Sequence, residues 1–175
     1  MTDLKQLKLK NDYKKVEERI RTYNDYKQLC SLAKNIRQRV DADADYKHFL
    51  ELAEKAEYKA KIVRLLAKCP SPINDSLLEQ MAFNNFVEGC AVLDKTPSVR
   101  VIHNQLKKLG YAKTMAKQVE NDVGNRVFFE MADKGVVRYT SEYFVFKYAK
   151  HLTNPKTYKK VAEFFNSNEG LLEVA

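Results

Sequence analysis

The sequence predicts a mainly α-helical protein, in which an antiparallel helical hairpin or coiled coil precedes a domain of helices and one β-hairpin. Three observations predict this fold. Apolar residues recur every three or four positions over most of the first 68 residues, as in amphipathic helices. Pro70 and Pro72 interrupt that pattern. The only β-branched and aromatic runs that flank a polar tip lie between residues 136 and 147.

The first predicted helix extends from Leu9 to Val40. Its apolar positions follow steps of three and four, with one local change of phase where two steps of three follow each other, at Tyr23, Tyr26 and Leu29. A second helix carries a seam of mostly small side chains: Tyr46, Phe49, Ala53, Ala56, Ala60, Val63 and Ala67. Small residues on one seam and bulky residues on the other let two antiparallel helices approach closely, so a hairpin is expected.

The connection between these helices contains aspartates at positions 41, 43 and 45. They match the first ligand positions of a calcium-binding EF-hand loop, but the glycine and closing glutamate positions hold Tyr46 and Leu52. We expect Asp45 to cap the second helix instead.

Four segments follow from the proline boundary. Residues 1–69 form the helical hairpin, which we expect to serve dimerisation or partner docking. Residues 76–94 form a bridging helix, because Ser76 and Glu79 have the spacing of a capping box. Residues 96–150 form the domain that ends in the β-hairpin, and residues 151–175 form a C-terminal helix and tail that begins at Asn154-Pro155.

The third segment contains two or three helices. A helix starts at Thr96-Pro97 and ends at Gly110. The next pattern, residues 112–134, fits one long helix or two. Because Gly124 lies in its middle, where glycine costs about 1 kcal/mol relative to alanine, we predict a break between Asn121 and Asn125.

The β-hairpin is predicted from residues 136–140 and 143–147, with Ser141 and Glu142 at its tip. A lone hairpin is marginally stable, so the preceding helices are expected to cover its apolar face.

This order of elements resembles the winged helix-turn-helix superfamily over residues 96–150. The residues that carry the resemblance are 115–119, which match the positioning helix, and 127–137, which match the end of a recognition helix and the first wing strand. The resemblance implies binding to double-stranded DNA and a regulator of transcription or replication. Winged helices also dock proteins, so the fold alone does not decide the function.

The resemblance also implies which side chains face DNA. Asn, Gln and Arg are suited to base edges and Lys to phosphates, and the wing strands would reach the backbone or the minor groove. The candidate DNA-binding residues are Lys113, Lys117, Gln118, Asn121, Asn125, Arg126, Arg138 and Lys147.

Charge favours a polyanionic partner. The net charge is +8. Residues 1–68 carry 17 basic and 11 acidic side chains, residues 69–97 carry one and four, and residues 98–175 carry 13 and eight. Both ends of the chain are therefore basic. Two alternatives remain: a protein-interaction module that acts as adaptor or inhibitor of a host or partner complex without nucleic-acid specificity, and an RNA-binding protein.

Other function classes lack support in the sequence. The three histidines are scattered, the three cysteines form no C-x-x-C pair, and no glycine-rich phosphate loop occurs, so we expect neither an enzyme nor a metal or cofactor site. No apolar run approaches the roughly 20 residues that span a bilayer, and the first residues lack a signal-peptide core. We therefore expect a cytoplasmic protein that does not enter a membrane, and the helical hairpin leads us to expect a homodimer.

Overall fold

The computed structural model describes residues 3–95 and 100–173, and all regular structure in these ranges is helical. The chain divides into two compact units, Met1–Ala67 and Lys68–Ala175, called unit 1 and unit 2. Within the described ranges, each helix is too short or too polar to cross a bilayer.

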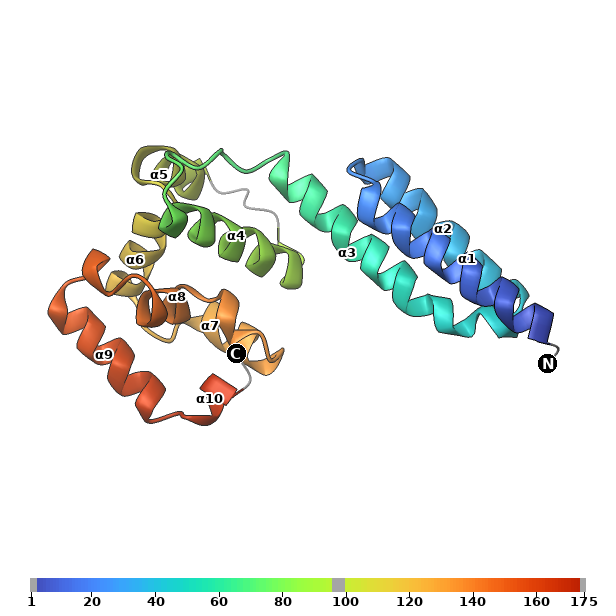
Figure 1. Cartoon of the computed structure of the whole chain (residues 1–175). Helices are drawn as coiled ribbons and strands as arrows, with labels where there is room; N and C mark the ends of the chain where they lie inside the picture. Colours follow the sequence, from blue (N-terminus) through green and yellow to red (C-terminus); the bar gives the residue numbers. More distant parts are fainter. Residues whose placement is uncertain (1–2, 96–99, 174–175) are drawn as a thin grey trace. The chain divides into compact units, whose positions relative to one another are not determined.

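Unit 1 is a bundle of three helices: α1 (Asp3–Thr22), α2 (Tyr26–Ala42) and α3 (Leu50–Leu66) (Figure 1). A 3-10 turn, η1 (Ala44–Phe49), joins α2 to α3. Most of the core lies between α2 and α3, where Leu29, Leu52 and Ala53 are fully buried. The small seam residues Ala56 and Ala60 are also buried, so α2 and α3 approach closely as the sequence pattern predicts.

The prediction of one helix from Leu9 to Val40 is wrong, because the chain leaves the helical conformation at residues 23–25. Asp25 causes the new start: its side chain accepts a hydrogen bond from the backbone N–H of Gln28 at 2.8 Å and caps α2. The break lies where the apolar pattern changes phase. The predicted cap by Asp45 is also wrong, since Asp43, two residues earlier, caps η1 and Asp45 pairs with Lys5.

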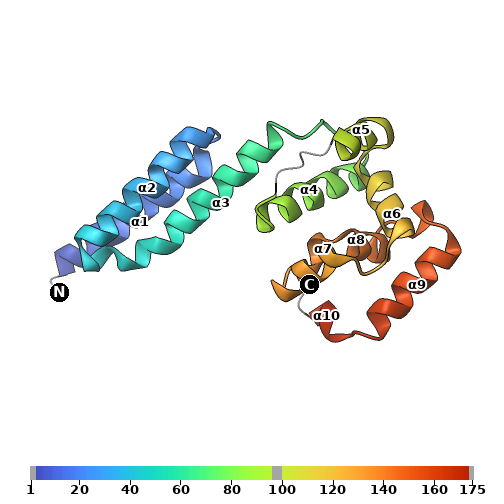
Figure 2. The same ribbon diagram turned by 180° about the vertical axis from the view of Figure 1, so that it is seen from behind.

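Unit 2 is built around α6. Its described helices are α4 (Leu77–Val92), α5 (Arg100–Leu109), α6 (Tyr111–Asn121), α7 (Arg126–Asp133), η2 (Val137–Tyr139), α8 (Ser141–Lys147), η3 (Lys150–Leu152), α9 (Pro155–Asn166) and α10 (Gly170–Glu173). The central helix α6 packs against α4, α5 and α8 (Figure 2). The largest fully buried side chains of this core are aromatic: Tyr111, Phe128, Phe144 and Phe165.

The predicted β-hairpin, and with it the winged-helix fold, is wrong. Residues 137–139 form η2 and residues 141–147 form α8, and the described residues contain no strand. Thr140 decides the outcome, because its hydroxyl accepts a hydrogen bond from Tyr143 N at 3.1 Å and starts a helix at the expected hairpin tip. The apolar composition that suggested strands instead reflects burial: Phe144 and Val145 are adjacent and both fully buried.

Two other predicted boundaries are confirmed. The chain breaks between α6 and α7, where Asn125 accepts hydrogen bonds from Val127 N at 2.9 Å and Phe128 N at 3.1 Å. The last long helix begins at Pro155, with Asn154 as its cap. Both starts use the side-chain chemistry that the sequence indicates.

Candidate functional site

The outward face of α6 carries three of the predicted DNA-binding residues. Lys113, Lys117 and Asn121 follow one another at four-residue intervals, which places them on one side of the helix, and all three are exposed. Arg126, the first residue of α7, is exposed as well. No hydrogen bond or ion pair with another described residue engages Lys113, Lys117 or Asn121, so their polar groups are open to a ligand. Arg126 forms no hydrogen bond to another described residue, but its charge acts on the nearby Glu130 carboxylate.

An acidic residue on the same helix holds a further basic segment in place. Glu120 accepts hydrogen bonds from the backbone N–H and the side-chain amide of Asn154, both at 3.0 Å. This contact fixes the start of α9, and the exposed Lys156, next to α6. Lys150 lies in η3, which also contacts α6, with its ammonium 4.8 Å from the ring centre of Tyr158. The sequence pattern did not reveal Lys150 and Lys156 as site residues, since their position depends on a contact across 34 residues.

Two other predicted residues use their polar groups within the fold. The side-chain oxygen of Asn125 caps α7, and its side-chain nitrogen donates a hydrogen bond to Glu142 at 3.4 Å. The Gln118 side-chain oxygen accepts a hydrogen bond from the Ser141 hydroxyl at 2.9 Å. Substitution of Asn125 would therefore remove a helix cap, and its effect on binding could not be separated from its effect on stability.

Arg138 and Lys147 do not lie on wing strands. Arg138 belongs to η2, and its guanidinium lies 4.9 Å from the ring centre of Tyr139. Lys147 ends α8, and its ammonium lies 5.5 Å from the ring centre of Phe146. Both side chains are exposed, but the expected role of wing contact to DNA is excluded because no wing is present among the described residues.

A hollow of about 650 Å³ lies beside this face within unit 2. Gln118, Asn121, Asn125 and Arg126 all line it, so four of the eight predicted residues meet at one place. The rest of its wall is largely apolar, with contributions from Phe86, Leu93, Ile102, Met115, Phe128 and Met131.

A buried carboxyl group supports the connection between α6 and α7. Glu142 is 2% exposed and accepts a hydrogen bond from the Gly124 backbone N–H at 3.2 Å. Burial raises the pKa of Glu142, and the N–H donors around the carboxyl group oppose this rise only in part. The side chain thus holds Gly124, Asn125 and the start of α7 in position. This arrangement has a free-energy cost, because the carboxyl group is removed from water.

This arrangement predicts a pH effect on stability. Because the pKa of Glu142 is higher in the folded than in the unfolded chain, its contribution is fully present below the unfolded pKa and is lost as the pH rises through the folded pKa. Glu142→Gln should not show this loss. The unfolding free energy of the variant minus that of the wild type should therefore increase from pH 4 to pH 7. Urea unfolding at both pH values measures the difference. The exposed Glu163→Gln serves as control, and an equal pH response in the two variants would contradict the prediction.

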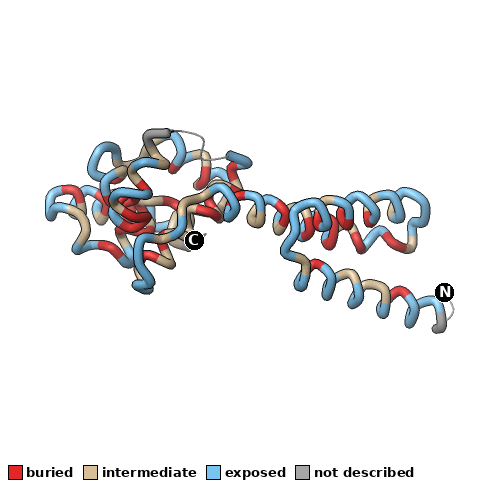
Figure 3. The backbone as a smooth tube through the Cα atoms, turned by 90° about the horizontal axis from the view of Figure 1, so that it is seen from above, coloured by how far each residue is buried: buried red, intermediate tan, exposed pale blue. Residues whose placement is uncertain are grey.

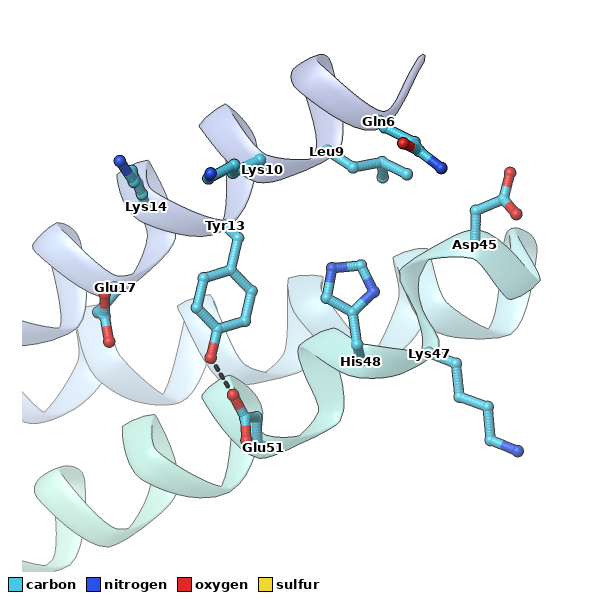
Figure 4. Close-up of a pocket in the computed structure, with 10 residues that line it drawn as sticks. All are labelled: Gln6, Leu9, Lys10, Tyr13, Lys14, Glu17, Asp45, Lys47, His48 and Glu51. Carbon is cyan, nitrogen blue, oxygen red and sulfur yellow. Dashed lines mark hydrogen bonds between the residues drawn. The ribbon is translucent and has the colours of Figure 1, made fainter. Parts of the chain in front are cut away.

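Unit 1 has an open groove of about 910 Å³ between α1 and the segment formed by η1 and the start of α3 (Figure 4). Tyr13 reaches across it and donates a hydrogen bond to Glu51, which raises the pKa of Tyr13 to about 12. The Tyr13 ring also stacks on His48, with 5.8 Å between ring centres. Charges of both signs line the groove: Lys10, Lys14, Lys47, Glu17, Asp45 and Glu51.

The thiols of unit 2 are poorly suited to nucleophilic chemistry. Burial raises the pKa of Cys69, and it raises the pKa of Cys90 to about 12, so both are protonated near neutral pH. Residues 3–95 and 100–173 contain no cluster of three His, Cys, Asp or Glu side chains arranged to hold a metal ion.

Comparison with protein-family models, with curated proteins and with solved structures gave no match to this chain.

Proposed function

We propose that the protein binds double-stranded DNA through the outward face of α6, with regulation of transcription or replication as its role. The observation that carries the proposal is the row of Lys113, Lys117 and Asn121, continued by Arg126 and joined by Lys156 at the start of α9. Within the described residues, the ammonium groups of Lys113, Lys117 and Lys156 have no hydrogen bond or ion pair, which leaves them available to phosphates.

The chemistry of the face divides into two parts. The lysines would neutralise phosphates, which gives affinity without sequence selectivity. Asn121 and Arg126 are the groups that can recognise base edges, because an amide or a guanidinium makes paired hydrogen bonds to a base. With few phosphate contacts and no wing in the described residues, binding is expected to be moderate, and the slope of log affinity against log salt concentration is expected to be small.

The double substitution Lys113→Gln/Lys117→Gln tests this proposal. It should weaken binding to a labelled random-sequence duplex and reduce the slope of log affinity against log salt concentration by about two, since each phosphate contact contributes about one. Fluorescence anisotropy between 20 and 200 mM salt measures both quantities.

The matched control is Lys34→Gln/Lys55→Gln, which removes the same charge from exposed positions on α2 and α3 of unit 1. Equal losses in the two double variants would show that total charge, rather than the α6 face, causes binding. Preference for an RNA duplex over a DNA duplex in competition would assign the face to RNA instead.

The groove of unit 1 favours a second candidate function, a protein-interaction module. The groove is open and carries aromatic and charged groups. If docking of a protein is the main function, the wild-type chain should show no affinity for duplex DNA even at 20 mM salt.

A further inference from the structure

Helix α1 is held less firmly than the other two helices of unit 1. Among the described residues of α1, the buried side chains are Leu9 and Ile20, which are 7% and 8% exposed, whereas α2 and α3 share an almost continuous buried seam (Figure 3). The open groove beside Tyr13 shows that α1 covers the η1 and α3 surface incompletely (Figure 4). Fewer buried side chains have to be uncovered when α1 leaves its place than when α2 or α3 does, and Tyr13, Val16 and Tyr23 are only partly buried.

The connection between α1 and α2 resembles a helix that has been interrupted. Residues 23–25, Tyr-Asn-Asp, include neither glycine nor proline, and the helical apolar pattern continues on both sides. Two contacts maintain the interruption. Asp25 caps α2 through Gln28 N, and the Lys59 ammonium donates to the backbone oxygens of Ile20 at 2.8 Å and Arg21 at 2.7 Å. In a continuous helix those oxygens would accept hydrogen bonds from the backbone N–H groups of residues 24 and 25.

The contacts of α1 with its neighbours do not depend on the connection. Tyr13 bonds Glu51, and Asp12 accepts a hydrogen bond from the Tyr46 hydroxyl at 3.2 Å. The Tyr13 and Phe49 rings meet edge to face with centres 5.3 Å apart. An identical α1 from another chain presents the same groups to the same surface, so each contact can form between two copies.

We propose that two copies of the chain exchange α1. Residues 23–25 become helical, α1 and α2 join into one helix of about 60 Å, and α1 of each copy packs on η1 and α3 of the other. The exchange loses the Asp25 cap and the Lys59 contacts, which are the polar contacts at the end of α1 and the start of α2. Because both copies donate the same helix, the dimer is two-fold symmetric and closed.

The double variant Asp25→Ala/Lys59→Gln tests the proposal with the full-length chain. Loss of one helix cap makes the monomeric arrangement less favourable by about a factor of five in each chain. Because two chains exchange α1, the dimerisation constant should rise at least about 25-fold, as measured by sedimentation equilibrium. Tyr13→Phe is the matched control: it removes a hydrogen bond that both forms contain, so it should leave the dimerisation constant unchanged. A double variant that dimerises no more strongly than the wild type would overturn the proposal.

Two further measurements separate exchange of α1 from ordinary association. Asn24→Pro blocks a continuous helix and should abolish the dimer of the double variant, and Asn24→Gly should weaken it if the proline variant does not fold. In a mixture of isotope-labelled and unlabelled chains, exchange predicts nuclear Overhauser effects between Tyr13 of one copy and Phe49 of the other. A dimer with only intramolecular effects between these rings would refute the exchange.

Discussion

Phe144→Ala is expected to lower the unfolding free energy of unit 2 by about 3–5 kcal/mol. Phe144 is fully buried in α8, and its ring contacts lie in the core around α6, so truncation leaves a cavity. The matched control is Phe129→Ala on α7, where the side chain is 51% exposed and truncation should cost less than about 1 kcal/mol. A urea titration followed by the NMR signals of unit 2 measures both values.

The same experiment distinguishes a helix from a strand at this position. A helix can bury the adjacent residues Phe144 and Val145 together, whereas a strand turns them to opposite faces. Val145→Ala should therefore also destabilise unit 2. If only one of the two adjacent substitutions reduces stability, the helical assignment of α8 is contradicted.

Glu79→Ala is expected to destabilise unit 2 by about 2–5 kcal/mol, because it leaves two buried donors without an acceptor. Glu79 is 3% exposed, and its carboxylate accepts hydrogen bonds from Tyr111 N at 2.7 Å and Ala112 N at 3.0 Å. Gly110, with φ of +79°, lets the carboxylate approach, since a Cβ at this position would lie 2.5 Å from Glu79 Oε1.

The control for Glu79→Ala is Glu163→Ala on α9, which removes an exposed carboxylate and should change stability by less than about 0.5 kcal/mol. Glu79→Gln keeps one oxygen acceptor, so its loss of unfolding free energy should lie between those of Glu79→Ala and Glu163→Ala. Equal unfolding free energies for Glu79→Ala and Glu163→Ala would show that the buried contact with α6 contributes nothing.

The helix starts that were predicted correctly depend on a cap, which is a local interaction. Ser76 and Asn154 cap helices where the sequence indicates, and the glycine at 124 marks a true break. Glu79 shows the limit of the same rule. Its spacing from Ser76 predicts a bond back to the start of its own helix, but the carboxylate bonds α6, 32 residues away.

The hairpin was predicted wrongly because strand propensity and deep burial favour the same residues. Tyr, Phe and Val are frequent in strands, but they also occur in a short helix that is covered by neighbours on most sides. Here α6 and α9 provide that cover. The Thr140 cap is the local feature that distinguishes a helix from a strand here, but Thr140 was predicted to be the last residue of a strand.

The candidate site was predictable in the exposed residues of α6, but not in the amides of Asn125 and Gln118. Lys113 and Lys117 lie on a helix whose pattern is clear from the sequence, and they are exposed as expected. Whether Asn125 and Gln118 face a ligand depends on Glu142 and Ser141, which lie on a segment whose fold was predicted wrongly. A polar side chain reveals its chemistry in the sequence, but its partner is set by tertiary contacts.

The bond between Glu79 and the first turn of α6 has a consequence for how unit 2 opens. The initial amides of a helix usually fray, because no earlier carbonyl binds them. In α6 they are tied to a carboxylate from α4, while Glu120 near the other end of α6 is tied to Asn154. The helix that presents the basic face is therefore anchored near both ends to segments distant in sequence, and its hydrogen bonds should break only when the whole unit unfolds. A ligand would meet a surface that is rigid before it arrives.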